Sequence, residues 1–83
     1  MTETETPIVM YGADWCRDCV RAKAFFDKAG VTYSYIDIEA VEDGADRALA
    51  ISGRTNIPVV VFPDGSHLVE PTDSELQAKL ATN

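Results

Sequence analysis

The sequence lacks the features that would direct a chain into or across a membrane. No stretch approaches the ~20 consecutive apolar residues that a membrane-spanning helix needs. Residues 1–6 are acidic and polar, whereas a secretory signal starts with positive charge and continues into an apolar segment. We therefore expect a soluble, cytoplasmic protein with no membrane partner.

Basic residues are also scarce. Seven Lys and Arg face fourteen Asp and Glu, which gives a formal net charge of −7 over 83 residues. A nucleic-acid-binding surface needs clustered positive charge, and an anionic lipid surface would repel this chain. The charge therefore argues against nucleic acid and against a membrane surface as partners.

Cysteine and histidine are too few for a disulfide framework or a structural metal centre. The only two cysteines, Cys16 and Cys19, are separated by two residues, so a bridge between them would close almost no loop. Structural zinc takes four ligands, and beyond this pair the chain has one histidine, His67. We therefore expect neither a structural staple nor a bound metal.

What is present is the composition of one small folded domain. Apolar residues make up 46% of the chain and charged residues 25%, both ordinary values for a globular protein. We expect residues 1–6 to form a disordered tail and residues 7–83 to form a single domain.

Apolar patterns predict seven secondary-structure elements. Alternating or continuous apolar residues predict strands at residues 7–11, 31–38, 57–62 and 67–70, and spacings of three and four predict helices at residues 15–29, 40–52 and 74–81. Asp14 is the expected cap of the first helix, and Gly30 and Gly53 the expected ends of the first two. The expected buried positions are Cys19, Ala22, Phe26 and Ala29 in the first helix, and Ala45, Leu49 and Ala48 or Ile51 in the second.

The order βαβαββα predicts an α/β fold. A strand–helix–strand unit implies a parallel crossover, and the closing hairpin adds antiparallel strands. The expected result is a mixed four-stranded sheet flanked by three helices. A Cys-x-x-Cys at the first strand-to-helix junction of such a unit is typical of a thioredoxin-like redox site.

Over residues 7–82 the chain resembles the glutaredoxin family. The resemblance is carried by YGADWCRDC at residues 11–19, by residues 28–33, 36–38 and 56–58, and by a tail at residues 61–72 that is most similar to the actinobacterial mycoredoxin branch. Three departures concern the region that meets the thiol co-substrate. Arg17 and Asp18 lie between the cysteines, where an apolar-aromatic pair is usual, and Asn56-Ile57 precedes the proline, where Thr-Val is common. Asp64-Gly65 follows the third strand, where the family has Gly-Gly.

The two cysteines are expected to have different roles. At the start of the helix Cys16 faces backbone N–H groups that favour a thiolate, so we expect it to be the nucleophile. Cys19 lies on the apolar face, where burial keeps its pKa higher, and we expect it to resolve the disulfide. In the alternative, Cys19 has only a packing role, and Cys16 alone carries out a monothiol cycle.

Further candidate residues surround this pair. The resemblance implies that Pro58 is cis and that it presents the backbone of Ile57 to an extended thiol substrate. Trp15 would form an apolar wall beside the sulfur, and Tyr11 would either donate a hydrogen bond to the thiolate or expose its hydroxyl at the surface. Arg17 and Arg54 are candidates for binding a carboxylate. Thr72 and Asp73 either cap the last helix or help the N-terminus of that helix to bind a carboxylate.

The resemblance implies a thiol–disulfide oxidoreductase. It would reduce mixed disulfides between proteins and a low-molecular-weight thiol. We expect that thiol to be mycothiol in preference to glutathione. We also expect a monomer without a tightly bound cofactor. One alternative is a dithiol carrier that a flavin-dependent thioredoxin reductase feeds, for example toward ribonucleotide reductase. Another is a thiol or iron–sulfur binding module.

Overall fold

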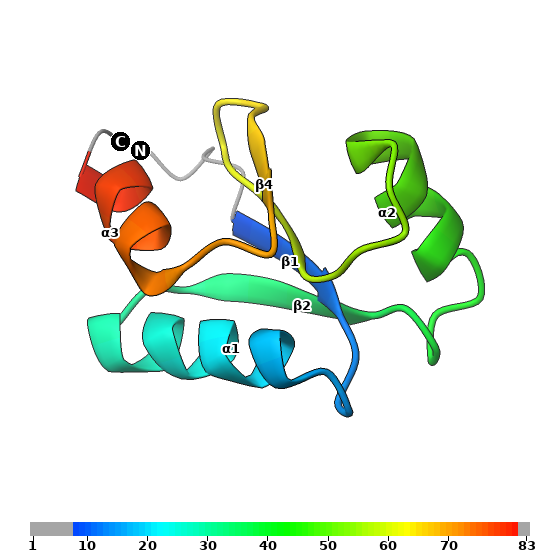
Figure 1. Cartoon of the computed structure of the whole chain (residues 1–83), viewed down its shortest axis with the longest axis horizontal. Helices are drawn as coiled ribbons and strands as arrows, with labels where there is room; N and C mark the ends of the chain where they lie inside the picture. Colours follow the sequence, from blue (N-terminus) through cyan, green and yellow to red (C-terminus); the bar gives the residue numbers. More distant parts are fainter. Residues whose placement is uncertain (1–7, 82–83) are drawn as a thin grey trace.

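Strand β1 (Ile8–Gly12) lies inside the sheet, with apolar residues on both of its faces. In the computed structural model, which describes residues 8–81, β1 pairs in parallel with β2 (Tyr33–Asp37) and antiparallel with β3 (Val59–Val61). Strand β4 (His67–Val69) pairs antiparallel with β3, so the strand order is β2-β1-β3-β4 (Figure 1). This confirms the predicted mixed four-stranded sheet.

The three helices divide between the two faces of the sheet. The helices are α1 (Arg17–Ala29), α2 (Gly44–Ser52) and α3 (Asp73–Ala81). On one face, Phe26 of α1 and Leu76 of α3 pack with Met10 of β1. On the other, Ala48 of α2 packs with Val59 of β3. Within residues 8–81, no helix combines the length and apolar character needed to cross a bilayer.

The element order matches the prediction, and the boundaries differ by a few residues. The predicted strands at residues 31–38, 57–62 and 67–70 are shorter, at 33–37, 59–61 and 67–69. The last helix begins one residue earlier, at Asp73. The predicted tail at residues 1–6, and Pro7 in the first predicted strand, lie outside the described residues.

Helix α1 begins at Arg17 and is capped at its C-terminal end by Gly30, whose φ of 71° suits glycine. Cys19, Ala22 and Phe26 are fully buried on its inner face, as predicted. The prediction for Ala29 was wrong, because the helix ends there and its side chain is exposed.

Helix α2 starts four residues later than predicted. The carboxylate of Asp37 accepts hydrogen bonds from the N–H groups of Glu39 and Ala40, at 2.8 and 3.3 Å, which folds this segment into turns instead of a helix. Gly44 then approaches the sheet so closely that an added Cβ would lie 2.9 Å from Cα of Ile38.

This late start sets which face of α2 is buried. Gly44 and Ala48 face inward, and Ile51 packs beside them. Ala45 and Leu49 are exposed, so their predicted inward positions were wrong.

Candidate functional site

Cys16 occupies the N-cap of α1. Asp14 was expected there, and that prediction was wrong because residues 13–16 form a turn, closed by the N–H of Cys16 donating to the carbonyl of Ala13 at 3.1 Å. The Cys16 sulfur accepts a hydrogen bond from the N–H of Cys19 at 3.3 Å, as an N-cap side chain does for the first free amides of a helix. The helix N-terminus therefore stabilises negative charge on this sulfur.

Cys19 lies behind Cys16 and is fully buried. It packs with Ala13 and Cys16, against the partly buried Ile38 and Ile57. Burial raises the pKa of the Cys19 thiol to about 12, and its hydrogen bond with Cys16 adds to the rise. Cys19 is therefore protonated at neutral pH. The predicted burial is confirmed, and both cysteines are free thiols.

The loop before β3 faces the Cys16 sulfur. The Ile57–Pro58 peptide bond is cis, as predicted. The Cys16 thiol donates a long hydrogen bond, 3.8 Å, to the carbonyl of Ile57. Behind this contact, the N–H of Glu70 donates to the carbonyl of Pro58 at 2.9 Å. The end of β4 therefore holds the proline loop beside α1.

A groove with a volume of about 440 Å³ opens at Cys16. Its lining residues are Trp15, Cys16, Arg17 and Asp18 from the start of α1, Thr55, Asn56 and Ile57 from the proline loop, and Glu70. Arg17 makes no ion pair within residues 8–81, whereas Asp18 lies 3.5 Å from Arg21. The groove thus brings one guanidinium and two carboxylates to the thiol.

Sequence reasoning missed two groove residues, Thr55 and Glu70. Glu70 also has an unusual backbone conformation. Its φ of 49° lies in the left-handed region, which a glutamate seldom adopts. Its carboxylate accepts a hydrogen bond from the Asn56 amide at 3.2 Å. In the sequence Glu70 is only the last residue of a predicted strand, and no local pattern places a strand end beside a cysteine 54 positions earlier.

Trp15 forms an exposed wall of the groove, with 66% of its surface accessible. Its indole N–H donates to the Glu39 carboxylate at 2.9 Å. This contact fixes the ring's orientation beside Cys16 from a segment that follows β2. The predicted place of Trp15 next to the sulfur agrees with the structure.

Two further predicted site residues do not line the groove. Tyr11 is buried on the α2 face, where it packs with Ala48 and Val59, and its hydroxyl donates to neither thiol. Arg54 lines a neighbouring hollow, of about 250 Å³, beside α2, and this hollow shares Thr55 and Ile57 with the groove.

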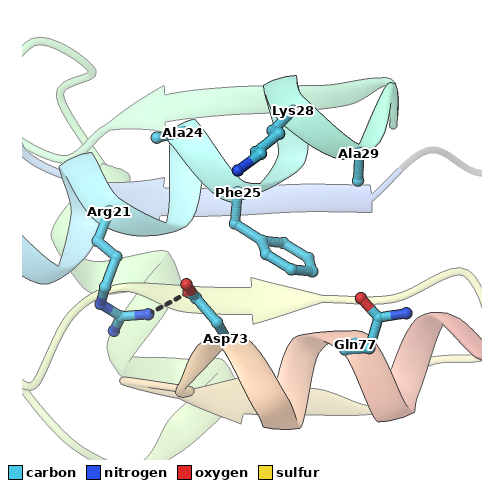
Figure 2. Close-up of a pocket in the computed structure, with 7 residues that line it drawn as sticks. All are labelled: Arg21, Ala24, Phe25, Lys28, Ala29, Asp73 and Gln77. Atoms are coloured by element: carbon cyan, nitrogen blue, oxygen red, sulfur yellow. Dashed lines mark hydrogen bonds and ion pairs between the residues drawn. The ribbon is translucent and has the colours of Figure 1, made fainter.

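Thr72 and Asp73 have structural partners at the start of α3. Thr72 caps α3, since its hydroxyl accepts from the N–H of Glu75 at 3.1 Å and the Glu75 carboxylate accepts from the N–H of Thr72 at 2.8 Å. Asp73 pairs with Arg21 at 2.7 Å, at one end of a hollow of about 530 Å³ between α1 and α3 (Figure 2).

Among residues 8–81 there is no group of three or more His, Cys, Asp or Glu side chains placed to hold a metal ion.

Comparisons with known proteins agree with this geometry. A family model described as glutaredoxin matches residues 8–68. A Mycobacterium tuberculosis protein provisionally named a glutaredoxin is 32% identical over 74 residues, which cover 88% of each chain. Mycoredoxin 1 of Corynebacterium glutamicum is 28% identical over 88% of this chain and 91% of its own.

A solved structure agrees as well. The crystal structure of a glutaredoxin from Archaeoglobus fulgidus superimposes with a TM-score of 0.80 at 28% identity, covering 89% of this chain and 85% of that one.

Proposed function

Since the chain belongs to the glutaredoxin family and is a thiol–disulfide oxidoreductase, we propose that it reduces mixed disulfides between proteins and a low-molecular-weight thiol at Cys16. The observation that carries the proposal is the position of the Cys16 sulfur. It lies at the N-cap of α1 and at the mouth of a groove, with the protonated Cys19 thiol behind it.

In the first step, the Cys16 thiolate attacks the small thiol's sulfur in the mixed disulfide. A bond forms between Cys16 and the small thiol, the original disulfide bond breaks, and the substrate protein leaves as a thiolate that takes up a proton. The N–H of Cys19 already points at the attacking sulfur.

In the second step, the disulfide between Cys16 and the small thiol is broken. Either a second small thiol attacks the one bound to Cys16 and leaves as the small-molecule disulfide, or Cys19 attacks Cys16 and expels the small thiol. Because Cys19 is buried and protonated, the second route is slow near neutral pH. The first route is therefore the main cycle.

The charges of the groove favour mycothiol over glutathione as the small thiol. Glutathione carries free carboxylates, whereas mycothiol, whose cysteine is joined to a sugar, carries none. Arg17 is the groove's cation, and the carboxylates of Asp18 and Glu70 oppose a second anionic group. The hydrogen-bonding side chains of Thr55 and Asn56 suit a polyhydroxylated ligand. Similarity to mycoredoxin 1 supports the same choice.

The test compares three proteins on two substrates. Wild type, Cys16→Ser and Cys19→Ser are each assayed on a carrier protein capped with mycothiol and on the same protein capped with glutathione. We expect Cys16→Ser to be inactive, Cys19→Ser to keep a substantial rate, and the mycothiol-capped substrate to react faster.

Each result has an opposite that counts against the proposal. Turnover by Cys16→Ser would remove the assigned nucleophile. A Cys19→Ser protein that unfolds at the wild-type temperature, yet is inactive on both substrates, would instead support a dithiol carrier fed by a flavin reductase. Thermal unfolding comes first, because a hydroxyl buried at position 19 has no assured partner and destabilises a small domain.

A further inference from the structure

The Tyr35 hydroxyl is a buried polar group without a hydrogen-bond partner in the described structure. Such a group destabilises a folded protein, and it calls for an explanation where it lies near reactive groups. Tyr35 comes from β2, opposite Met10 of β1, and its ring packs under α1. Lys23 of α1 covers the ring, with its Nζ 4.0 Å from the ring centroid.

Gly12 brings this ring beside Cys19. A Cβ built on Gly12 would lie 2.8 Å from the Cys19 sulfur and 3.2 Å from Cε1 of Tyr35, so both atoms border the space that the missing side chain leaves open. Cε1 is next to the ring carbon that bears the hydroxyl. The edge of the tyrosine and the buried thiol therefore share one small space behind Cys16.

We propose that Tyr35 is a positioning residue for the resolving step, whose hydroxyl donates a hydrogen bond to the Cys19 thiolate when that thiolate forms. The proposal rests on the proposed function, because it concerns the route in which Cys19 attacks the small thiol's disulfide with Cys16. It also accounts for the orphaned hydroxyl, because a thiolate is a much stronger hydrogen-bond acceptor than the thiol that precedes it.

The step balances without an external oxidant or reductant. Cys19 loses its proton to solvent, and its thiolate attacks the Cys16 sulfur. The bond between Cys16 and the small thiol breaks, the bond between Cys16 and Cys19 forms, and the small thiol leaves as a thiolate that is then protonated. Tyr35 keeps its own proton throughout.

The surroundings keep that proton on the hydroxyl. Burial raises the pKa of Tyr35 to about 12, and negative charge at Cys19, Asp14, Asp37 and Cys16 acts in the same direction. Lys23, over the ring face, is the cation next to the ring. Tyr35 is therefore a hydrogen-bond donor over the working pH range.

The decisive variant is Tyr35→Phe, with Tyr33→Phe as its matched control. The Tyr35→Phe substitution keeps the ring and the Lys23 contact and removes only the oxygen. Tyr33 lies on the same strand and the same face, but its hydroxyl points to Asp27 at 3.5 Å, away from the cysteines. In each protein, Cys16 is first capped completely with mycothiol. Release of mycothiol by Cys19 is then followed from pH 6 to pH 10 without added thiol.

We expect Tyr35→Phe to slow this release by about tenfold or more at every pH, since a hydrogen bond to a charged sulfur is lost. The rate-against-pH curve should move to higher pH, and Tyr33→Phe should follow the wild-type curve. Tyr35→Phe should unfold at the wild-type temperature or above, since it removes an unpaired buried group. A merely structural role would lower that temperature and leave the pH curve in place.

The outcomes separate this inference from the proposed function. If Cys16 cannot be capped by mycothiol or by glutathione in any of the proteins, the proposed function fails, and the inference fails with it. If capping succeeds and Tyr35→Phe matches wild type in rate and pH curve, the inference alone is overturned.

Discussion

The backbone N–H of Cys19 donates a hydrogen bond to the sulfur of Cys16 at 3.3 Å. One cysteine thus supplies the amide that supports negative charge on the other, while its own sulfur is fully buried. The three-residue spacing of the two cysteines produces this arrangement, because the side chain of an N-cap residue lies close to the amide of the third helical residue. The two sulfurs therefore differ in accessibility and in hydrogen bonding.

The first prediction concerns alkylation. In the reduced, folded protein, iodoacetamide at neutral pH should label Cys16 at least tenfold faster than Cys19. The Cys16 sulfur accepts an amide hydrogen bond at the helix start, and Cys16 keeps 9% of its surface exposed at the groove, whereas Cys19 is fully buried. Trypsin cleaves after Arg17 and so places the cysteines on different peptides, which mass spectrometry can quantify separately. In denaturant the two rates should converge, and equal rates in the folded protein would contradict the division of roles.

The second prediction concerns stability at high pH. The pKa of Cys19 is raised from 9.0 to about 12 and that of Tyr35 from 10.0 to about 12, both mainly by burial. A raised folded-state pKa means that the unfolded chain loses its proton first. The stability from both groups is therefore complete below about pH 9 and is lost as the pH rises toward 12.

Urea unfolding from pH 7 to pH 11 measures this loss. The free energy of unfolding should fall in wild type, and less steeply in a Cys19→Ala, Tyr35→Phe double variant. If the unfolding free energy of the two proteins fell equally steeply with pH, Cys19 and Tyr35 would not be the cause of the loss of stability at high pH.

The third prediction concerns Glu70 and the choice of thiol. Glu70→Gln removes a carboxylate from the groove and keeps an oxygen that can accept from Asn56. Activity on a glutathione-capped protein should rise by about threefold at low salt, the scale of one exposed charge pair, and activity on a mycothiol-capped protein should change less. The matched control is Glu42→Gln, at an exposed position outside the groove. An equal gain on both substrates would remove Glu70 as a selectivity residue.

The fourth prediction concerns the start of α3. Thr72→Ala removes half of the reciprocal pair with Glu75, so the protein should lose about 1 kcal/mol of unfolding free energy. Thr72→Ser, which keeps the hydroxyl, should recover most of it. Chemical unfolding of the three proteins measures their free energies of unfolding. An unchanged free energy in Thr72→Ala would mean that the cap does not stabilise the protein.

Local patterns determined much of this protein. The positions of Cys19, Ala22 and Phe26 follow helical spacing, and all three are buried in α1. Strands β1 and β3 match apolar runs, since a short buried strand needs apolar side chains on both faces, whereas β2 matches an alternating pattern. Because Cys16 and Cys19 lie three residues apart at the start of one helix, the pair could be found from the sequence alone.

Two failures of local patterns, at the starts of α1 and α2, come from competing hydrogen bonds that helical spacing does not reveal. The Asp37 carboxylate takes the amides of Glu39 and Ala40, so the helix expected from residue 40 begins at Gly44 instead. The turn at residues 13–16 likewise moves the helix cap from Asp14 to Cys16. Helical propensity is a weak preference, and one well-placed acceptor outweighs it.

Only the tertiary structure decided what surrounds the two sulfurs. Glu70 reaches the groove because its N–H bonds to Pro58 across the β3–β4 pair, and nothing near it in the chain indicates a φ of 49°. Tyr35 and Cys19 border one space because parallel pairing places β2 beside β1, where Gly12 has no side chain. The chemistry of the pair is local, since three residues at a helix start create it. The groove and the buried hydroxyl depend on contacts between distant segments, which no periodicity in the sequence encodes.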